Sequence, residues 1–389
     1  MSKINKKICI VTGSRADYDI LKNLIICLNK SKKIKLDLIV TGQHLSKEYG
    51  NTGKMVYKDF GKICHSIDIR IKKTNSDSIL NSIGIGINKI GKYLQLKKPD
   101  LVILLGDRYE IFSAAIGSIY SDIKIAHIHG GELTVGSLDD LIRHSITKLS
   151  NFHFVSTDIY KKRVIQMGEN PKNVFNVGAL GAENTENIKL ISKEKLEEKL
   201  SIKFKKNNFI ITINSFIEEK FSIEYLLKNF FSALKKLKNT AFIFTMPNSD
   251  LKSDIIKSEI LKFCKNKKNC YFFRSLGSQN YHSCVKVCDA VLGNSSSGIL
   301  EVPSLKIATV NIGDRQNGRV QANSIINTDY SSKKIYNSIR KSLSPNFKRK
   351  IKKIKNPYSK KNTANNIVKI IENNILDKKI ESKKFYDIK

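Results

Sequence analysis

The sequence predicts an α/β protein with two Rossmann-like, doubly wound domains. Three observations support this fold class. Strand-like apolar runs alternate with helical patterns along the whole chain. Some of these runs are apolar throughout, as in LVILL after Asp100, which is typical of parallel strands covered on both faces. The chain has 389 residues, too many for one ordinary core, and this length favours two domains.

The first series of elements is expected to form an N-terminal domain over residues 1–180. Its strands are expected at Ile8–Gly13, Leu36–Gly42, Asp100–Gly106, Ile123–Ile128 and Phe152–Ser156. Its helices are expected at Asp17–Asn29 and Ser78–Lys97, with two more that begin at Tyr109 and Asp139. In a parallel sheet of this kind, ligands bind outside the carboxyl ends of the strands.

The pattern breaks over Gly178–Leu200, a polar, glycine-containing stretch that indicates a linker. A second series of elements then forms an expected C-terminal domain over residues 181–375. Its strands are expected at Phe209–Ile213, Thr240–Met246, Cys270–Arg274, Asp289–Gly293 and Ala308–Ile312. A last helix is expected at Asn362–Ile375, followed by a polar tail over residues 376–389. Two such domains leave a cleft between them, and interdomain clefts commonly hold substrates.

Composition narrows the function classes. The formal net charge is +34, but the excess is mostly lysine spread along the chain without a nucleic-acid motif. We therefore expect no nucleic-acid partner, while the positive field would attract an anionic substrate. No apolar run reaches the length of a membrane span, and the chain begins without a signal peptide, so a cytoplasmic protein is expected. The seven cysteines lie mostly in apolar segments and suggest neither a disulfide framework nor a zinc site.

The stretch from Gly106 to Ser150 is unusually dense in titratable groups. They are Asp107, Arg108, Glu110, His127, His129, Glu132, Asp139, Asp140, Arg143 and His144. Most of them stand where a strand ends or a helix begins. Such a set beside apolar strands indicates acid–base chemistry rather than a solvated surface.

Plainer explanations of this stretch remain open. Acidic residues at a helix start, such as Asp139 and Asp140, are favoured by the helix dipole. Asp139–Arg143 and Asp140–His144 have the spacing of ion pairs within one helix. His127 and His129, with Glu132, could also be metal ligands.

Two strand-to-helix turns are candidate anion sites. In VTGSRADYD, backbone amides after Gly13 and the side chain of Arg15 suit a phosphate, although an ordinary turn capped by Asp17 is equally consistent. In VLGNSSSGILEVPSL, successive amides and hydroxyls suit phosphate oxygens, and Glu301 could accept from ribose hydroxyls. A serine helix cap is the simpler alternative there. IGDRQNGR adds Arg315 and Arg319, which favours a diphosphate-sized anion.

Together these motifs resemble the hydrolysing UDP-N-acetylglucosamine 2-epimerases of sialic-acid synthesis and their relatives in legionaminic-acid synthesis. The matching motifs cover nearly the whole chain in order: TGSRADY, TGQHLSKEYGNT, LLGDRYEIF, HIHGGE, DDLIRHSITKLS, VFNVGALG, GNSSSGILEVPS and NIGDRQNGR. The resemblance implies a glycosyltransferase-B type fold with UDP in the cleft, in a homodimer or homotetramer, and a mechanism that needs no metal ion or nicotinamide cofactor. It also implies elimination of UDP to a 2-acetamidoglycal, then addition of water to give a free manno-configured sugar.

The resemblance also implies residue roles. Acid–base positions of the family fall on Asp107, His129, Glu132, Asp139, Asp140 and His144. Positions that bind UDP fall on Arg15, Ser295, Ser296, Glu301 and Arg315, with Ser297 in the same motif. Arg108 is expected to contact substrate, and His44 matches a histidine near the sugar.

The chain departs from the family pattern at two places. Many members have HIEGGE where this chain has HIHGGE, so His129 replaces a carboxylate; histidine titrates near neutrality and can serve as a base. The family usually has His-Pro where this chain has Asn214-Ser215, and asparagine near the diphosphate cannot carry charge. The sequence therefore predicts a UDP-N-acetylglucosamine 2-epimerase. The alternatives are the same reaction on a UDP-2,4-diacetamido-2,4,6-trideoxy sugar and a catalytically weakened UDP-sugar-binding protein.

Overall fold

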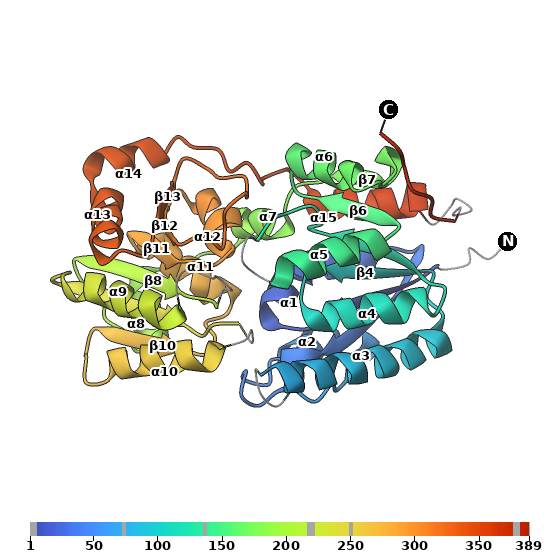
Figure 1. Ribbon diagram of the computed structural model, residues 1–389, viewed down its shortest axis with the longest axis horizontal. Helices are drawn as coiled ribbons and strands as arrows, with labels where there is room; N and C mark the ends of the chain where they lie inside the picture. Colours follow the sequence, from blue (N-terminus) through green and yellow to red (C-terminus); the bar gives the residue numbers. More distant parts are fainter. Residues whose placement is uncertain are drawn as a thin grey trace. The chain divides into compact units, whose positions relative to one another are not determined.

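The structure is a computed structural model that describes residues 6–71, 75–134, 138–215, 222–248, 252–375 and 382–388. The chain divides into two compact units. Unit 1 comprises Met1–Glu132, Leu138–Glu183 and Lys360–Lys389, and unit 2 comprises Leu133–Ser137 and Asn184–Ser359. Each unit is built around one parallel sheet (Figure 1).

The sheet of unit 1 has the strand order β3-β2-β1-β4-β5-β6-β7, and all of its strands are parallel. The strands are β1 (Lys6–Thr12), β2 (Ile34–Thr41), β3 (Cys64–Ile67), β4 (Leu101–Leu105), β5 (Lys124–Ile128), β6 (Phe152–Val155) and β7 (Val174–Asn176). The helices are α1 (Arg15–Lys30), α2 (Gly53–Phe60), α3 (Ser76–Lys97), α4 (Tyr109–Ile119), α5 (Leu138–Leu149), α6 (Asp158–Gln166), α7 (Leu180–Asn187) and α15 (Thr363–Ile370), of which α7 continues into unit 2. The order reverses between β1 and β4, which is the switch point where doubly wound sheets bind ligands.

Two apolar cores cover the faces of this sheet because successive strand residues point to opposite sides. Ile8 and Ile10 of β1 pack with α1 and α15, whereas Cys9 and Val11 pack with α3, α4 and α5 (Figure 1). Both faces are therefore covered by helices, as the all-apolar strands predict.

The sheet of unit 2 has the order β10-β9-β8-β11-β12-β13, again entirely parallel. Its strands are β8 (Asn207–Thr212), β9 (Thr240–Thr245), β10 (Cys270–Phe273), β11 (Ala290–Gly293), β12 (Ala308–Ile312) and β13 (Ile325–Thr328). Its helices are α8 (Lys193–Leu200), α9 (Ile223–Lys235), α10 (Ser253–Cys264), α11 (Ser278–Val287), α12 (Ser297–Leu300), α13 (Ser332–Leu343) and α14 (Pro345–Ile351). Here the order reverses between β8 and β11. The predicted fold class of two Rossmann-like α/β sheets is confirmed.

The structure differs from the sequence expectation at three points. The expected linker over 178–200 contains α7 and α8; Ser192 caps α8, whose Leu196 is fully buried. The short edge strands β3, β7 and β13 were not predicted. Residues 360–389, expected in the second domain and its tail, belong to unit 1, because Ile367 and Ile371 pack against the core beside α1.

All seven cysteines are free thiols. In the part of the chain that the structure describes, no helix is both long and apolar enough to span a membrane.

Candidate active site

The carboxyl ends of β1 and β4, which are adjacent in the sheet, carry the first group of predicted site residues. Glu110 is completely buried and accepts a hydrogen bond from Arg108 Nε at 2.6 Å. Gly13 and Gly42 leave the space that its side chain fills, since a Cβ atom on Gly13 would lie 2.3 Å from Glu110 Oε1. Gly13, which precedes the backbone amides that suit a phosphate, therefore also makes room for a buried carboxylate whose role the sequence pattern did not indicate.

His44 lies beside this group and is fully buried. Its ring nitrogens contact Thr12 Oγ1 at 3.0 Å and Thr52 Oγ1 at 2.9 Å. Burial, together with the charges of Arg108 and Arg15, lowers the pKa of His44 to about 3. His44 is therefore neutral near pH 7 and acts as a hydrogen-bonding group rather than as a charge.

The start of α1 is capped by Ser14, whose side chain accepts from Asp17 N. The expectation that Asp17 is the capping residue is wrong. Burial raises the pKa of Asp17 to about 6, with Arg108 opposing the shift. Arg15, the first residue of the helix, pairs with Asp19 at 3.1 Å.

Arg143 organises the central cluster of unit 1. Its side chain is only 2% exposed and projects from α5, where it forms an ion pair with Asp107 at the end of β4. Its Nη1 also donates to the backbone oxygen of Glu132 at 3.1 Å and lies 3.4 Å from Asp140 Oδ1. Asp140 in turn lies 3.5 Å from His144 Nε2, so the buried guanidinium has two carboxylate partners, one of which also pairs with an imidazole. Asp139 stands half-buried in the first turn of the same helix.

His129 and Glu132 form a second, buried pair at the end of β5. His129 Nδ1 lies 2.7 Å from Glu132 Oε1, which also accepts from Ser156 Oγ at 2.8 Å. His129 has a left-handed backbone (φ 68°), uncommon for a residue other than glycine and often found at functional sites. Its Nε2 is buried and has no hydrogen-bond partner among the residues that the structure describes.

His127, read in the sequence as a candidate metal ligand, has a structural role. Its Nε2 donates to the backbone oxygen of Gly106 at 2.7 Å, and its Nδ1 contacts Thr147 Oγ1 of α5 at 3.2 Å. Burial lowers the pKa of His127 to about 3. A neutral His127 thus ties the residue before Asp107 to the helix that carries Arg143. The described residues contain no cluster of three or more His, Cys, Asp or Glu side chains that could hold a metal ion.

In unit 2, Asn294 links the two strands at the switch point. Its Oδ1 accepts from Asn214 N at 2.7 Å, and its Nδ2 donates to Asn214 O at 2.9 Å. Arg315 Nη1 and Gln316 Nε2 both donate to Asn294 O, at 3.3 and 2.8 Å. Gly293 has a φ of 130° and lies so close to β8 that a Cβ atom would stand 1.9 Å from Thr212 O. The backbone of Asn214 and the side chain of Asn294 therefore form a buried, doubly hydrogen-bonded pair that orders the Gly293–Asn294 turn.

The serines after this turn differ in their partners. Ser297 donates to Glu301 Oε2 at 3.0 Å and contacts Tyr281, while Glu301 also pairs with His282 at 3.1 Å. Ser295 and Ser296 stand half-buried, and across the described ranges their hydroxyls form no hydrogen bond. These two hydroxyls are thus available to a ligand. His282, for which the sequence indicated no role, orients the carboxylate of Glu301.

Arg319 contacts a different segment of the chain from Arg315. Its Nε donates to Leu133 O at 2.8 Å, and its Nη2 to Thr134 Oγ1 at 3.2 Å. These two residues directly follow the HIHGGE motif in the chain. Arg319 thus orders the segment after Glu132 rather than presenting a cation to an anion.

The predicted residues fall into two sets, one in each unit. Unit 1 holds Arg15, His44, Asp107, Arg108, His129, Glu132, Asp139, Asp140 and His144. Unit 2 holds Asn214, Ser295, Ser296, Ser297, Glu301 and Arg315.

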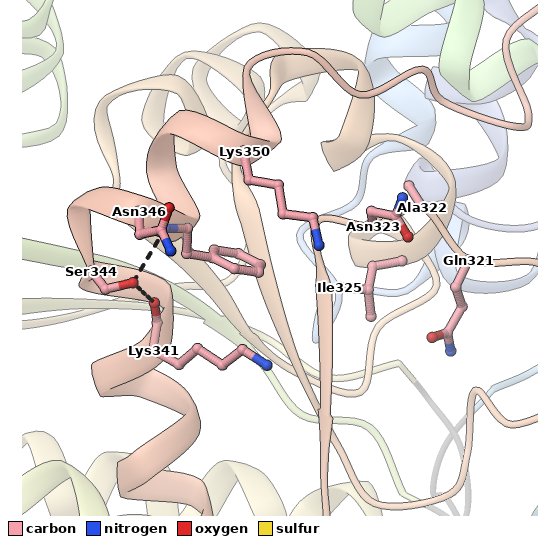
Figure 2. Close-up of a pocket in the computed structure, with 9 residues that line it drawn as sticks. Gln321, Ala322, Asn323, Ile325, Lys341, Ser344, Asn346 and Lys350 are labelled. Atoms are coloured by element: carbon pink, nitrogen blue, oxygen red, sulfur yellow. Dashed lines mark hydrogen bonds between the residues drawn. The ribbon is translucent and has the colours of Figure 1, made fainter.

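Unit 2 also has a cavity of about 570 Å³ whose lining includes Lys341, Lys350, Asn346 and Phe347. Figure 2 shows the two lysine side chains extending into it. Ile325, the first residue of β13, lies in its wall, so the cavity is at the amino ends of the parallel strands. It is therefore at the opposite sheet edge from the Gly293–Asn294 turn.

Comparisons with known proteins agree with the motifs. A sequence profile of the UDP-N-acetylglucosamine 2-epimerase family matches residues 27–372. The chain is 43% identical over 384 residues to polysialic acid biosynthesis protein P7 of Escherichia coli, with 98% of each chain covered. It is 40% identical over 330 residues to a GDP/UDP-N,N'-diacetylbacillosamine 2-epimerase (hydrolyzing) of Campylobacter jejuni, with 85% of each covered.

The fold matches solved structures as well. The structure of Methanocaldococcus jannaschii UDP-GlcNAc 2-epimerase, in complex with UDP-GlcNAc and UDP, superimposes with a TM-score of 0.77. The match covers 94% of this chain and 99% of that one at 19% identity, so it supports the fold alone. Profile, identity and coverage agree, and the chain belongs to the UDP-N-acetylglucosamine 2-epimerase family.

Proposed function

We propose that the protein is a hydrolysing 2-epimerase that converts UDP-N-acetylglucosamine to N-acetylmannosamine and UDP. The reaction proceeds by elimination of UDP to a 2-acetamidoglycal and by addition of water. The observation that carries the proposal is the Asp107–Arg143–Asp140 cluster beside the His129–Glu132 pair, at the carboxyl ends of β4 and β5. The names of the two relatives support the reaction class.

Unit 1 supplies the acid–base chemistry in this proposal. The C2 proton of the sugar is weakly acidic, so its removal needs a base of fixed position and charge. Asp107 meets the need for a fixed position because its carboxylate pairs with the buried guanidinium of Arg143. The other proton-transfer groups, Asp139, Asp140 and His144, lie on α5, the helix that carries Arg143.

His129 supplies the second proton-transfer group. A proton on Nδ1 donates to Glu132, which leaves the lone pair on Nε2 as the acceptor. In the hydration step that nitrogen can take up the proton that the attacking water loses and deliver a proton to C2 from the face opposite to the one that Asp107 deprotonates, which inverts C2. His129 can therefore take the place of the usual carboxylate, because the carboxylate of Glu132 supplies the negative charge beside it.

Unit 2 binds the leaving group. The hydroxyls of Ser295 and Ser296 and the guanidinium of Arg315 suit diphosphate oxygens, and Glu301, oriented by His282 and Ser297, suits the ribose hydroxyls. Arg15 and Arg108 of unit 1 add positive charge for the substrate. Asn214 contacts the turn through its backbone, and its uncharged side chain accepts from Asn248 N at 3.0 Å where the family usually has a histidine, so stabilisation of departing UDP rests on Arg315.

The same reaction on a UDP-2,4-diacetamido-2,4,6-trideoxy sugar is the second candidate. The observation that favours it is the 40% identity to a diacetylbacillosamine 2-epimerase. A UDP-sugar-binding protein with little turnover is the third candidate, motivated by Asn214. A homodimer or homotetramer stays a prediction of the family resemblance, and a cytoplasmic location stays a prediction of the sequence pattern.

Proton NMR in D2O tests the proposal. The purified protein is incubated with UDP-N-acetylglucosamine and, separately, with the diacetamido analogue. A free manno sugar with deuterium at C2, released together with UDP, is the expected product, and the ratio of the two kcat/KM values identifies the substrate. UDP release without deuterium at C2 would rule out the elimination mechanism. UDP binding without turnover of either sugar would favour the binding protein.

A further inference from the structure

The C-terminal segment, residues 382–388, lies on unit 1 and makes specific polar contacts there. Lys383 Nζ donates to the backbone oxygens of Lys148 and Ser150, at 2.6 and 2.5 Å, and pairs with Glu169 at 2.8 Å. Although the segment as a whole is exposed, the side chain of Lys383 retains only 26% of its accessibility. The family profile ends at residue 372, so it does not include this segment.

Tyr386 and Phe385 also contact unit 1 and hold the segment in place. Tyr386 N donates to Gly168 O at 2.9 Å, and the ring of Phe385 covers Gly168. A Cβ atom on Gly168 would stand 2.4 Å from Phe385 Cε2. The Nζ atom of Lys148 lies 5.0 Å from the centre of the Phe385 ring, which is cation–π geometry.

Glu169 is the buried centre of this contact. Its side chain is 4% exposed and receives Lys148 at 2.6 Å and His153 at 2.9 Å in addition to Lys383. Burial lowers the pKa of His153, so its Nε2–H donates as a neutral ring. Burial raises the pKa of Glu169, but the hydrogen bonds from His153, Lys148 and Lys383 outweigh it and the net shift is downward. Lys383 is therefore the second ammonium group, after Lys148, that pairs with the buried carboxylate of Glu169.

The carbonyl groups that Lys383 binds belong to the carboxyl end of α5. That end carries the negative pole of the helix dipole, where a cation is stabilising. α5 is the helix that also supplies Arg143 to Asp107 and Thr147 to His127. The helix is thus held at its middle by the end of β4 and β5, and at its carboxyl end by Lys383 and by Lys148, which donates to Met167 O at 2.9 Å.

We propose that the C-terminal segment is a positioning element of the active site, in which Lys383 fixes the carboxyl end of α5 and thereby holds Arg143 and Asp140 against Asp107. The inference rests on the proposed function for the role of Asp107. It assigns Lys383 no contact with substrate. A helix transmits a displacement at its end along its axis, and a shift of about 1 Å at reacting groups can cost roughly 100-fold in rate.

The test compares Lys383→Met with Lys384→Met in the full-length protein. The first variant removes the ammonium group and keeps the length of the side chain. The second removes the same charge from the next, exposed residue. Three quantities are measured: kcat and KM by NMR, the dissociation constant of UDP by calorimetry, and backbone hydrogen exchange by mass spectrometry.

For Lys383→Met we expect kcat to fall about 10- to 100-fold, with KM and UDP affinity within about twofold of wild type. Hydrogen exchange should be faster in peptides covering 138–149 and 106–110 and unchanged in unit 2. Lys384→Met should match wild type throughout. Equal kcat in the two variants, or a fall in kcat without faster exchange in α5, would overturn the proposal. Faster exchange across all of unit 1 would overturn it too, since this indicates general destabilisation.

Failure of the proposed function gives a different result. If the wild-type protein turns over neither nucleotide sugar, that function is wrong, and exchange alone decides the positioning role. Faster exchange confined to 138–149 and 106–110 then supports it, and unchanged exchange there refutes it.

Discussion

Replacing Asp107 by asparagine separates the chemistry of unit 1 from UDP binding. The side chain of Asp107 is 21% exposed and pairs with the buried guanidinium of Arg143. Asparagine keeps the shape and one acceptor oxygen but loses the charge and the ability to take a proton. Arg143 keeps Asp140 and the backbone oxygen of Glu132 as partners, so the variant should fold.

The expected magnitudes follow from these contacts. A hydrogen bond between charged groups contributes about 1.5–3 kcal/mol, and the exposed fraction of Asp107 and the retained acceptor reduce the loss to about 1–2 kcal/mol. For a unit of this size that corresponds to a fall of roughly 2–8 °C in Tm. Loss of a positioned general base lowers kcat by about 100- to 10,000-fold. UDP affinity should stay within about twofold, because the residues assigned to UDP binding lie mainly in unit 2.

Turnover is followed by release of UDP and by NMR of the sugar, UDP affinity by calorimetry, and Tm by circular dichroism. Asp100→Asn is the matched control, because Asp100 precedes β4 at its other end and pairs there with Lys6 at 3.4 Å. The control should keep wild-type kcat. Turnover of Asp107→Asn within about threefold of wild type would refute the assignment of Asp107 as a base. A loss of UDP affinity as large as the loss of kcat would refute the division of roles between the two units.

Further predictions concern the UDP-binding turn, the guanidinium near it and the buried histidine. Gly293→Ala should destabilise unit 2 by about 3 kcal/mol or more and weaken UDP binding, because the new Cβ meets Thr212 O and the residue has a φ of 130°. In thermal unfolding, Gly84→Ala on the exposed face of α3 should instead be neutral or stabilising. Arg315→Gln should raise the dissociation constant of UDP about 10- to 100-fold in calorimetry, and unchanged affinity would remove Arg315 from the diphosphate site. The lowered pKa of His127, about 3 in the folded state, means that the unfolded chain binds more protons between pH 6.5 and about 3. The free energy of unfolding should therefore fall as the pH decreases through this window. Urea unfolding at pH 7 and pH 5 should show a smaller fall for His127→Gln than for the wild type. An identical pH dependence in the variant would contradict a buried, neutral His127 ring.

Local sequence patterns were sufficient to predict all strands of the two sheets except the short edge strands β3, β7 and β13. The all-apolar run LVILL became β4, and the polar residues directly after it, Asp107 and Arg108, lie at its carboxyl end. A strand covered on both faces must be apolar at every position, and parallel strands end at one edge, so both conclusions follow from the chain without tertiary information. The motif order was likewise sufficient to place the protein in its family.

Partners across the fold could not be read from the sequence. The i,i+4 spacing offered Arg143 a partner within its own helix, and the structure adds Asp107, 36 residues away. The sequence showed Glu110 only as one of many charged residues in a dense stretch. Its buried position depends on Gly13 and Gly42, which leave the space for its side chain. The sequence predicted only that Asn214 replaces a histidine with an uncharged residue, and the structure shows that its backbone N and O bond to the side chain of Asn294.

The sequence by itself determined the fold class, the strand ends at which functional groups stand and the family, because each depends on short-range periodicity or on motif identity. Only the tertiary structure decided which charged side chains pair with one another in the interior. It also decided that the chain returns to unit 1 after residue 359 and places Lys383 at the carboxyl end of α5. These outcomes depend on packing between residues far apart in the chain, where burial makes an unpaired charge costly and so selects the partner.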